Sequence, residues 1–517
     1  MPPNFLFIIT DQHRADHTGF GGHPVLRTPN LDALASRGTV FDRAFVSNPI
    51  CMPNRATLHT GRMPSAHGTR MNGISLDWNA ETFVRRLRDT GYRTSHVGKS
   101  HLQTMGVPTK MNGLRLPEPG DGEAVRSVET AWHGLEETAR FESEGRAEFP
   151  EDFYGYEHVD MVVRHGDQCS GHYLQWLRAQ HDDADSLRGP EHALARCAHW
   201  NQVYQTAVPV DLYPTRYITR RAVAEIEASA ADDRPFFLHC SYPDPHHPFT
   251  PPGDYAERYS PSEIPLPESF YNAHEKSMPH VKKMIEQRGT PGLAVHGWAV
   301  NEDQYRHAAV AEFGMIELID AGVGELLAAL TRTGVADDTV IVFTSDHGDM
   351  FGDHGLMLKH ALHYEACTRV PLVIAHPDHT PVRTAQLAST VDLAPTLLDL
   401  AGAPAYHGIQ GRSLVPLLGN PSAGVRDGVL IEEDEPEDWV DAGRALRMRT
   451  LVTARGRITT YHGCDAGELY DHERDPLELE NLWDRQDQRE LKMDMLWALH
   501  QAMLDVAVET PRATHQA

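Results

Sequence analysis

Between residues 4 and 401, short apolar runs alternate with helical patterns along the chain. The apolar runs are the expected strands, at 4–10, 92–97, 235–242, 339–344 and 370–375. The segments between them carry apolar residues at the spacing of one helix face, at 31–37, 80–90, 216–231, 302–331 and 392–401. Such alternation predicts an α/β fold in which helices sandwich a large, mostly parallel sheet.

Two segments interrupt this alternation, and a third changes it. Residues 103–210 are polar and weakly periodic, which suggests a long insertion, and residues 251–299 are rich in proline. After residue 411 we expect strands at 429–433, 446–454 and 457–462 and a final helix over about 485–506. The chain is therefore predicted to hold a large domain over residues 1–415 and a smaller α+β domain with an antiparallel sheet over residues 416–517.

The composition excludes several classes of partner. The 517 residues carry 73 acidic and 47 basic side chains, a net charge of −26, which disfavours nucleic acid and anionic membranes. The sequence contains no run of about 18 apolar residues, so it predicts no membrane span. The first residues, MPPNFLFIITDQ, resemble a strand and not a signal peptide, so we expect a cytoplasmic protein. Six scattered cysteines without a C-x-x-C pair predict neither a disulfide framework nor a zinc site.

Polar side chains follow four of the expected strands directly. These are Asp11 and Gln12, then Lys99 and His101, then Asp244, His246 and His247, and finally Asp346 and His347. Ligands of open α/β sheets bind outside the carboxyl ends of the strands, so we expect these side chains to share one site. The oxygen ligands and one imidazole suit a hard divalent cation, with Ca²⁺ as first choice and Mn²⁺ or Mg²⁺ as alternatives.

Each of these residues also has an ordinary structural explanation when taken alone. Asp11 and Gln12 could form a turn, Asn72 could be a turn residue, and Lys359 could be a solvated surface charge. Most of the 32 histidines cannot be catalytic. We expect His247, His354, His360 and His363 to lie behind the site or on the surface, and the cysteines at 169, 197, 240, 367 and 464 to be inert core residues.

Residues 51–62, CMPNRATLHTGR, have the form C-x-P-x-R-x-x-x-x-T-G-R. This motif resembles the signature of the type I sulfatases, in the alkaline phosphatase superfamily. Further segments are similar to family blocks in the family order, among them GYRTSHVGKSHL, SYPDPHHPFTPP, SDHGDMFGDHGLMLKH and ELYDHERDPLELENL. The resemblance implies hydrolysis of sulfate monoesters to an alcohol or phenol and sulfate.

The resemblance also implies a role for each residue of the site. Cys51 is converted to formylglycine by a generating enzyme, and one hydroxyl of the aldehyde hydrate attacks sulfur while the second releases sulfate. Asp11, Gln12, Asp346 and His347 hold the metal together with residue 51. Arg55 steadies the hydrate, Lys99 and Lys359 hold sulfate oxygens, and Asn72 is a further oxyanion contact. His101 is the base that acts on the hydrate, and His246 protonates the leaving group.

The sequence departs from the best-known sulfatases at three places. Asn54 stands where many members have serine, and the pairs Asp11-Gln12 and Asp346-His347 resemble those of choline sulfatases and phosphonate monoester hydrolases. Lys99 and His101, in contrast, resemble sulfatases. We therefore expect a small sulfate ester as substrate, and keep a phosphonate monoester or phosphodiester hydrolase as the alternative. An inactive binding protein is a distant alternative, because no mapped catalytic position carries an inert residue. The long insertion and the final helix suggest a dimer or tetramer.

Overall fold

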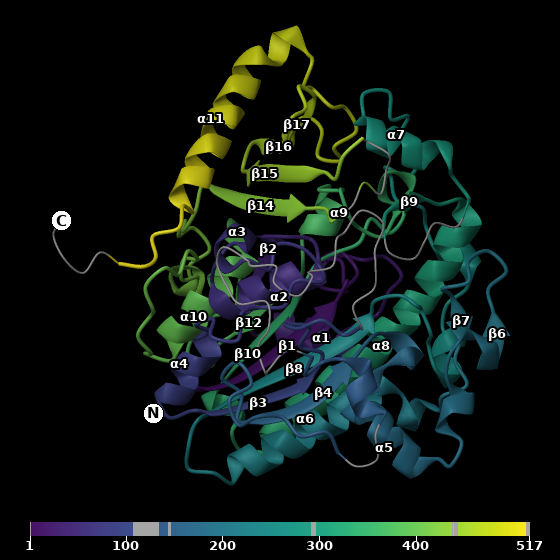
Figure 1. Cartoon of the computed structure of the whole chain (residues 1–517), viewed down its shortest axis with the longest axis vertical. Helices are drawn as coiled ribbons and strands as arrows, with labels where there is room; N and C mark the ends of the chain where they lie inside the picture. The colour runs from purple at the N-terminus through teal and green to yellow at the C-terminus, as the bar shows by residue number, and fades with distance from the viewer. Residues whose placement is uncertain are drawn as a thin grey trace, which may run out of the picture.

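The computed structural model describes residues 2–106, 134–142, 146–290, 296–436, 438 and 443–512. Its largest element is a nine-stranded sheet in the order β13-β2-β12-β10-β1-β8-β3-β4-β5 (Figure 1). The strands are β1 (Asn4–Asp11), β2 (Thr39–Phe45), β3 (Arg93–Gly98), β4 (His158–Val163), β5 (Ser170–Gly171), β8 (Phe236–Pro245), β10 (Thr339–Ser345), β12 (Leu372–Ala375) and β13 (Val382–Ser389). The central run β10-β1-β8-β3-β4 is parallel throughout.

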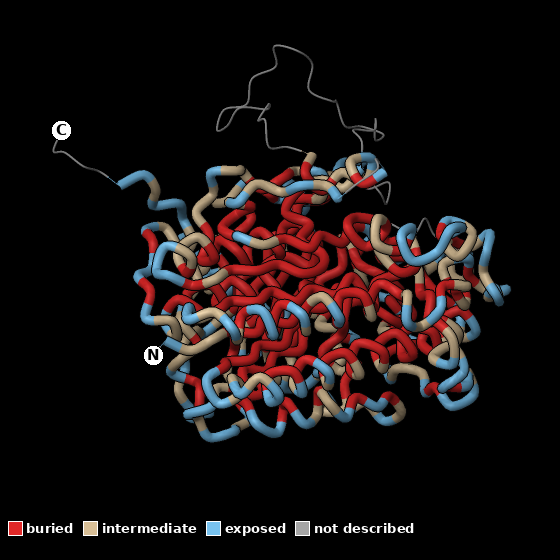
Figure 2. The backbone as a smooth tube through the Cα atoms, turned by 90° about the horizontal axis from the view of Figure 1, so that it is seen from below, coloured by how far each residue is buried: buried red, intermediate tan, exposed pale blue. Residues whose placement is uncertain are grey.

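Side chains of β1 alternate between the two faces of this sheet. Phe5, Phe7 and Ile9 join one buried cluster, while Leu6 and Ile8 join the other, as the two-residue period of a strand requires. On the first face lie α2 (Cys51–Thr60), α4 (Phe83–Asp89) and α10 (Leu393–Leu400). On the second lie α1 (Pro29–Ala35), α5 (His172–Gln180), α6 (Pro214–Ala230) and α8 (Glu302–Thr333). Both faces are therefore covered, and the buried residues gather in the middle of the molecule (Figure 2).

A second, four-stranded antiparallel sheet follows near the end of the chain. It consists of β14 (Gly428–Asp434), β15 (Arg447–Thr453), β16 (Gly456–Tyr461) and β17 (Gly467–Asp471), in that order. The helix α11 (Arg489–Asp505) buries Leu491, Met495 and Leu499 against this sheet. The expected fold class, a helix-covered sheet with a smaller antiparallel sheet, is confirmed. The domain boundary at residue 415 stays a prediction.

Short elements complete the chain: α3 (Pro64–His67), α7 (Pro279–Glu286), α9 (Glu365–Thr368), β6 (Ala195–Arg196), β7 (Tyr204–Gln205), β9 (Trp298–Ala299) and β11 (Leu356–Met357). Within the part of the chain that the structure describes, no helix combines the length and the apolar character needed to span a bilayer.

The expectation of one long insertion at 103–210 is wrong in part. Residues 107–133 and 143–145 of it lie outside the described residues, but β4 belongs to the main sheet and pairs with β3 in parallel. Sequence reasoning also missed β2 and β13. It expected the strand at 370–375, observed as β12, but not that β12 runs antiparallel to β10 and β2.

Candidate active site

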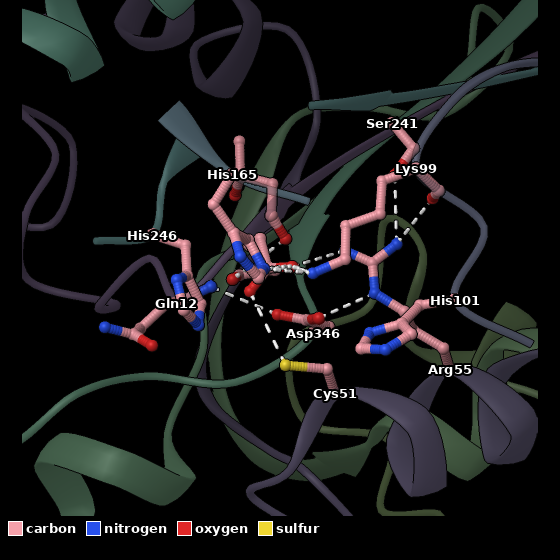
Figure 3. A network of polar contacts seen from close by, with 12 residues as sticks. Gln12, Cys51, Arg55, Lys99, His101, His165, Ser241, His246 and Asp346 are labelled. Carbon is pink, nitrogen blue, oxygen red and sulfur yellow. Dashed lines mark hydrogen bonds and ion pairs between the residues drawn. The ribbon is translucent and has the colours of Figure 1, made fainter. Parts of the chain in front are cut away.

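Five neighbouring parallel strands end at one edge of the main sheet, and each ends in, or is followed by, a polar side chain of the site. Figure 3 shows Lys99, His165, His246 and Asp346 gathered near Cys51. In sheet order, β10 precedes Asp346 and His347, β1 ends in Asp11, β8 precedes His246, β3 precedes Lys99, and β4 precedes His165 by one residue. The sheet therefore brings together residues that are up to several hundred positions apart in the sequence, as expected for the carboxyl edge of parallel strands.

The helix α2 delivers Cys51 to this edge. Cys51 is its first residue, and the helix ends at Gly61, whose φ of 57° is the left-handed conformation favoured by glycine. The side-chain oxygen of Asn72 accepts a hydrogen bond from the Met52 N–H, 3.2 Å away, in the first turn. The side chain of Asn54 donates to the backbone carbonyl of Asp346. Cys51 is thus held at the N-terminus of a helix, where the helix dipole favours an anion.

Four side chains form a donor set that could hold a metal ion. One donor atom each from Asp11, Cys51, Asp346 and His347 lies within 4.8 Å of every other. The Nδ1–H of His347 donates to the carbonyl oxygen of Gly348 at 2.8 Å, so its Nε2 faces the site, 3.1 Å from Cys51 Sγ. An imidazole whose other nitrogen is fixed in this way is a preorganised ligand. Two carboxylates and this imidazole fit a divalent cation.

Arg55 lies between the two carboxylates of this set. Its Nε donates to Asp346 at 2.7 Å, and one terminal nitrogen lies 3.4 Å from Asp11. The other terminal nitrogen donates to the carbonyl of Lys99 at 2.8 Å and to the hydroxyl of Ser241 at 3.0 Å. The guanidinium is one helical turn from Cys51 and joins α2 to the ends of four strands.

The Asp11 carboxylate at the centre is ionised because cations surround it. Burial alone would raise the pKa of Asp11, but the charges of Lys99 and Arg55 outweigh it and hold that pKa well below its usual range. The thiol pKa of Cys51 is also lowered, because Lys359, His347 and Lys99 outweigh burial and the charge of Asp11. The site is therefore a concentrated positive field around Cys51, suited to an anionic ester.

The two predicted lysines both lie inside the site. Lys359 is buried, and its Nζ lies 3.4 Å from Cys51 Sγ and 2.9 Å from the side-chain oxygen of Gln12. The alternative of a solvated surface charge is therefore wrong for Lys359. Lys99 is fully buried and contacts Asp11. Gly98, directly before Lys99, lets β3 run close beside β8, because a Cβ at residue 98 would overlap the carbonyl oxygen of Ser241.

Gln12 and His246 also reach the site, each in a fixed orientation. The Gln12 amide donates to Asp349 at 2.6 Å, and its carbonyl oxygen points to Lys359. His246 donates from Nδ1 to the carbonyl of His247 at 2.6 Å, so its Nε2 faces Lys359 Nζ at 3.1 Å. Burial, His165 and Lys359 hold the pKa of His246 well below its usual value, so the imidazole is neutral in the free site.

Sequence reasoning missed His165. Its ring stacks on His246 with centroids 3.7 Å apart, and its Nε2 accepts a hydrogen bond of 2.6 Å from Lys99. A signal was present: the segment HVDMVV ends two residues before His165 and has the character of a strand. Because this segment lies within residues 103–210, whose composition suggests an insertion, the local pattern does not assign it to the main sheet.

A cavity of about 550 Å³ opens onto these groups. Its wall includes Cys51, Asn72, His101, His165, His246 and Lys359, together with Met71, Met105, Arg164, Gln202, Asp434 and Glu435. The segment 103–210 and the end of β14 thus contribute to the cavity. The proline-rich segment 251–299 supplies none of its described lining residues.

The structure decides two further expectations, one between its alternatives and one by correction. His247, His354 and His363 are buried and His360 is mostly buried, so none of the four is a surface histidine. His247 contacts Gln12 and lies behind the site, whereas His363 contacts Glu433 of β14. Among the other cysteines, Cys464 is exposed and Cys197 is partly exposed, so these two are not core residues.

Comparison with known proteins identifies the family. Residues 3–403 match the Sulfatase family model, and residues 352–505 match the model of the N-sulphoglucosamine sulphohydrolase C-terminal region. The chain therefore belongs to the sulfatase family, within the alkaline phosphatase superfamily, and is a sulfuric ester hydrolase by descent.

Individual relatives agree with this assignment. The chain is 27% identical over 496 residues to an arylsulfatase of Clostridium perfringens, with 95% of this chain and 92% of that protein covered. It is 28% identical over 486 residues to a choline-sulfatase of Rhizobium meliloti, with 93% and 82% covered. The crystal structure of a phosphonate monoester hydrolase of Agrobacterium radiobacter superposes with a TM-score of 0.78 at 25% identity, covering 98% and 97% of the two chains.

Proposed function

We propose that this protein hydrolyses small sulfate monoesters with a formylglycine made from Cys51 and a divalent cation. The observation that supports this most is the placement of Cys51: it begins a helix, lies in the metal-donor set, and is 3.4 Å from the Lys359 ammonium. A thiol has no exit for a transferred sulfuryl group, whereas a formylglycine hydrate supplies one hydroxyl for attack and a second for release of sulfate.

Asp11, Gln12, Asp346 and His347 would hold the cation together with residue 51. A bound cation supplies Lewis-acid stabilisation of negative charge on oxygen. Ca²⁺ is the proposed ion, because three of these four side chains offer oxygen, and Mn²⁺ or Mg²⁺ is the alternative.

Two lysines neutralise the sulfuryl oxygens. The ammonium groups of Lys99 and Lys359 are buried and anchored by polar neighbours, so they need no reorganisation when charge develops on the transferred group. Arg55 holds Asp11 and Asp346 at a fixed separation and thereby fixes the donor set.

The histidines move protons. His246 presents Nε2 to the cavity, takes a proton when the anionic ester binds beside it, and gives it to the leaving oxygen. His101 lines the same cavity, and burial, Lys99 and Arg55 lower its pKa well below the usual value. It is therefore an unprotonated base at neutral pH.

A phosphonate monoester or phosphodiester hydrolase is the second candidate. It is favoured by the superposition on a phosphonate monoester hydrolase and by the Asp11-Gln12 and Asp346-His347 pairs. Such esters carry the same single negative charge as a sulfate ester, so the field of the site admits both. Lys99 and His101, together with the similarity to an arylsulfatase and a choline-sulfatase, favour sulfate.

Three further expectations stay predictions. They are a formylglycine-generating enzyme as partner, a location in the cytoplasm, and assembly into a dimer or tetramer.

The role of Cys51 is tested by mass spectrometry and turnover together. Protein made with a generating enzyme should yield a peptide whose residue 51 has the mass of an aldehyde, and that sample should hydrolyse an aryl sulfate. Cys51→Ala should lose turnover and keep its fold, because the substitution removes only a sulfur atom. Full activity of protein in which residue 51 remains an intact cysteine would contradict the proposal.

A further inference from the structure

Glu136 is a buried carboxylate that contacts none of the metal donors but touches the loop that carries Lys99 and His101. Its Oε2 accepts a hydrogen bond of 2.7 Å from the backbone N–H of His101. Its Oε1 accepts from the backbone N–H groups of Leu102 at 3.0 Å and Gln103 at 2.9 Å, and from the hydroxyl of Ser100 at 3.0 Å. Four donors from four successive residues thus converge on one side chain.

The contact is reciprocal. The side-chain oxygen of Gln103 accepts a hydrogen bond of 2.9 Å from the backbone N–H of Leu135. The backbone N–H of Thr138 donates to the carbonyl of Met105 at 3.0 Å. The segment around Glu136 and the loop after β3 therefore bind each other from both sides.

The loop needs such a support. His101 has a φ of 55°, a left-handed conformation that is uncommon for a residue other than glycine. Strained backbone of this kind persists only where its surroundings determine it. The first residue of the loop is fixed separately, since the Lys99 N–H donates to Ser241 and the Lys99 carbonyl accepts from Arg55. Glu136 fixes the part that follows.

We propose that Glu136 is a positioning residue for catalysis, which holds the backbone of residues 100–103 so that His101 stays in its catalytic orientation. The catalytic part of this inference rests on the proposed function, which gives His101 its role. The contacts of Glu136 with residues 100–103 do not depend on that function. Glu136 lies outside the motif blocks that the sequence shares with the family and outside the cavity wall. Burial raises the pKa of Glu136 to about 7, although its hydrogen bonds from backbone N–H groups act to lower it. The tests below are therefore made at pH 8, where the carboxylate is ionised.

The main variant is Glu136→Gln, which keeps the shape of the side chain but turns amide hydrogens toward backbone N–H groups. The matched control is Asp320→Asn. Asp320 is also a buried carboxylate that accepts two backbone N–H groups, those of Asn30 and Leu31, but it lies on α8 away from the cavity wall. Both substitutions should lower the melting temperature, and only the first should affect catalysis.

Hydrogen exchange tests the contact without any assay of activity. In Glu136→Gln the amides of residues 101–103 should exchange about tenfold faster than in the wild type, and in Asp320→Asn they should be unchanged. Unchanged exchange of this peptide in Glu136→Gln would overturn the proposal. If Glu136→Gln does not fold, Glu136→Asp, whose carboxylate is one methylene short, takes its place with the same expectations.

Turnover of an aryl sulfate tests the catalytic part. Glu136→Gln should lower kcat about 100-fold with less than threefold change in KM, since small displacements of catalytic groups have effects of this size. The double variant with His101→Ala should be no slower than His101→Ala alone, whereas the loss should multiply with His246→Ala. Multiplication with His101→Ala would overturn the proposal. Faster exchange with wild-type kcat would also overturn the proposal, whereas a wild-type kcat of His101→Ala itself would contradict the proposed role of His101.

Discussion

Lys99 is a fully buried cation with a carboxylate, Asp11, on one side and an imidazole, His165, on the other. A buried charge is costly unless it is paired and hydrogen-bonded. The hydrogen bond to His165 Nε2 also fixes the tautomer of that ring, because the accepting nitrogen cannot carry a hydrogen. The residue therefore combines a fixed position with a full positive charge, which an oxyanion contact needs.

We expect Lys99→Ala to lower kcat/KM for a sulfate ester on the order of 10²–10³-fold, as for the loss of other preorganised oxyanion contacts. Steady-state kinetics on an aryl sulfate measures this. Lys276→Ala is the control, because Lys276 is a half-exposed lysine paired with Glu480, and it should change the rate less than about twofold. A loss below tenfold at Lys99 would indicate that no sulfuryl oxygen contacts this ammonium.

At the scale of elements, the strand ends explain why so much of the site could be predicted. A run of apolar residues followed by Asp11 or Asp346 is visible in the sequence, and parallel pairing brings such ends together. What could not be predicted is the hydrogen bonding that orients each side chain. The hydrogen bond from the Met52 N–H to the side-chain oxygen of Asn72, for example, depends on the conformation of the folded loop.

The elements that sequence reasoning missed have polar residues inside strands. In β4, Asp160 interrupts the apolar pattern, yet it is fully buried because Tyr217 and Arg221 bond to it. In β2, Asp42 and Arg43 also interrupt the apolar pattern, and both are partly exposed. The strand β13 lies at the edge of the sheet, where Arg383 is exposed and Gln386 is partly exposed, whereas Thr384 and Ser389 are buried. Such compensation depends on partners far away in the sequence, so no local pattern reveals it.

The proposed metal site depends on β1, β10 and α2 together, which gives a second prediction. Removal of divalent cations with a chelator should abolish turnover, and added Ca²⁺ or Mn²⁺ should restore it. Asp346→Asn should weaken the restoration, because it removes one charged ligand of the donor set. Isothermal titration of the chelated protein measures the loss of affinity independently of turnover. Full activity of exhaustively chelated protein would contradict the assignment.

At the scale of the whole molecule, β14 joins the second sheet to the main domain through buried carboxylates. Glu433 accepts the backbone N–H of Ala361 at 3.0 Å and contacts His363 at 2.7 Å, two and four residues after Lys359. Burial and the neighbouring charge of Glu435 raise the pKa of Glu433 to about 7. The C-terminal part of the chain therefore supports the loop that carries Lys359.

This pKa predicts a pH-dependent stability. Between pH 4.5 and 7 the unfolded chain has released the proton of Glu433 while the folded protein still holds it, so the folded state loses stability as pH rises through this window. Glu433→Gln removes this loss. The free energy of unfolding of the variant relative to wild type should rise by about 1–3 kcal/mol from pH 5 to pH 8. Urea unfolding at several pH values measures it, with the exposed Glu257→Gln as control, and a pH-independent difference would contradict the prediction.

Sulfate and phosphonate chemistry share this fold, so the preference between them tests the central claim most directly. The measurement compares kcat/KM of formylglycine-containing enzyme on a panel of sulfate monoesters and a panel of phosphonate monoesters with matched leaving groups. With Lys99 and His101 both at the edge of the sheet, we expect the best sulfate ester to exceed every phosphonate by tenfold or more. Faster turnover of phosphonate monoesters than of every sulfate ester tested would contradict the proposed function.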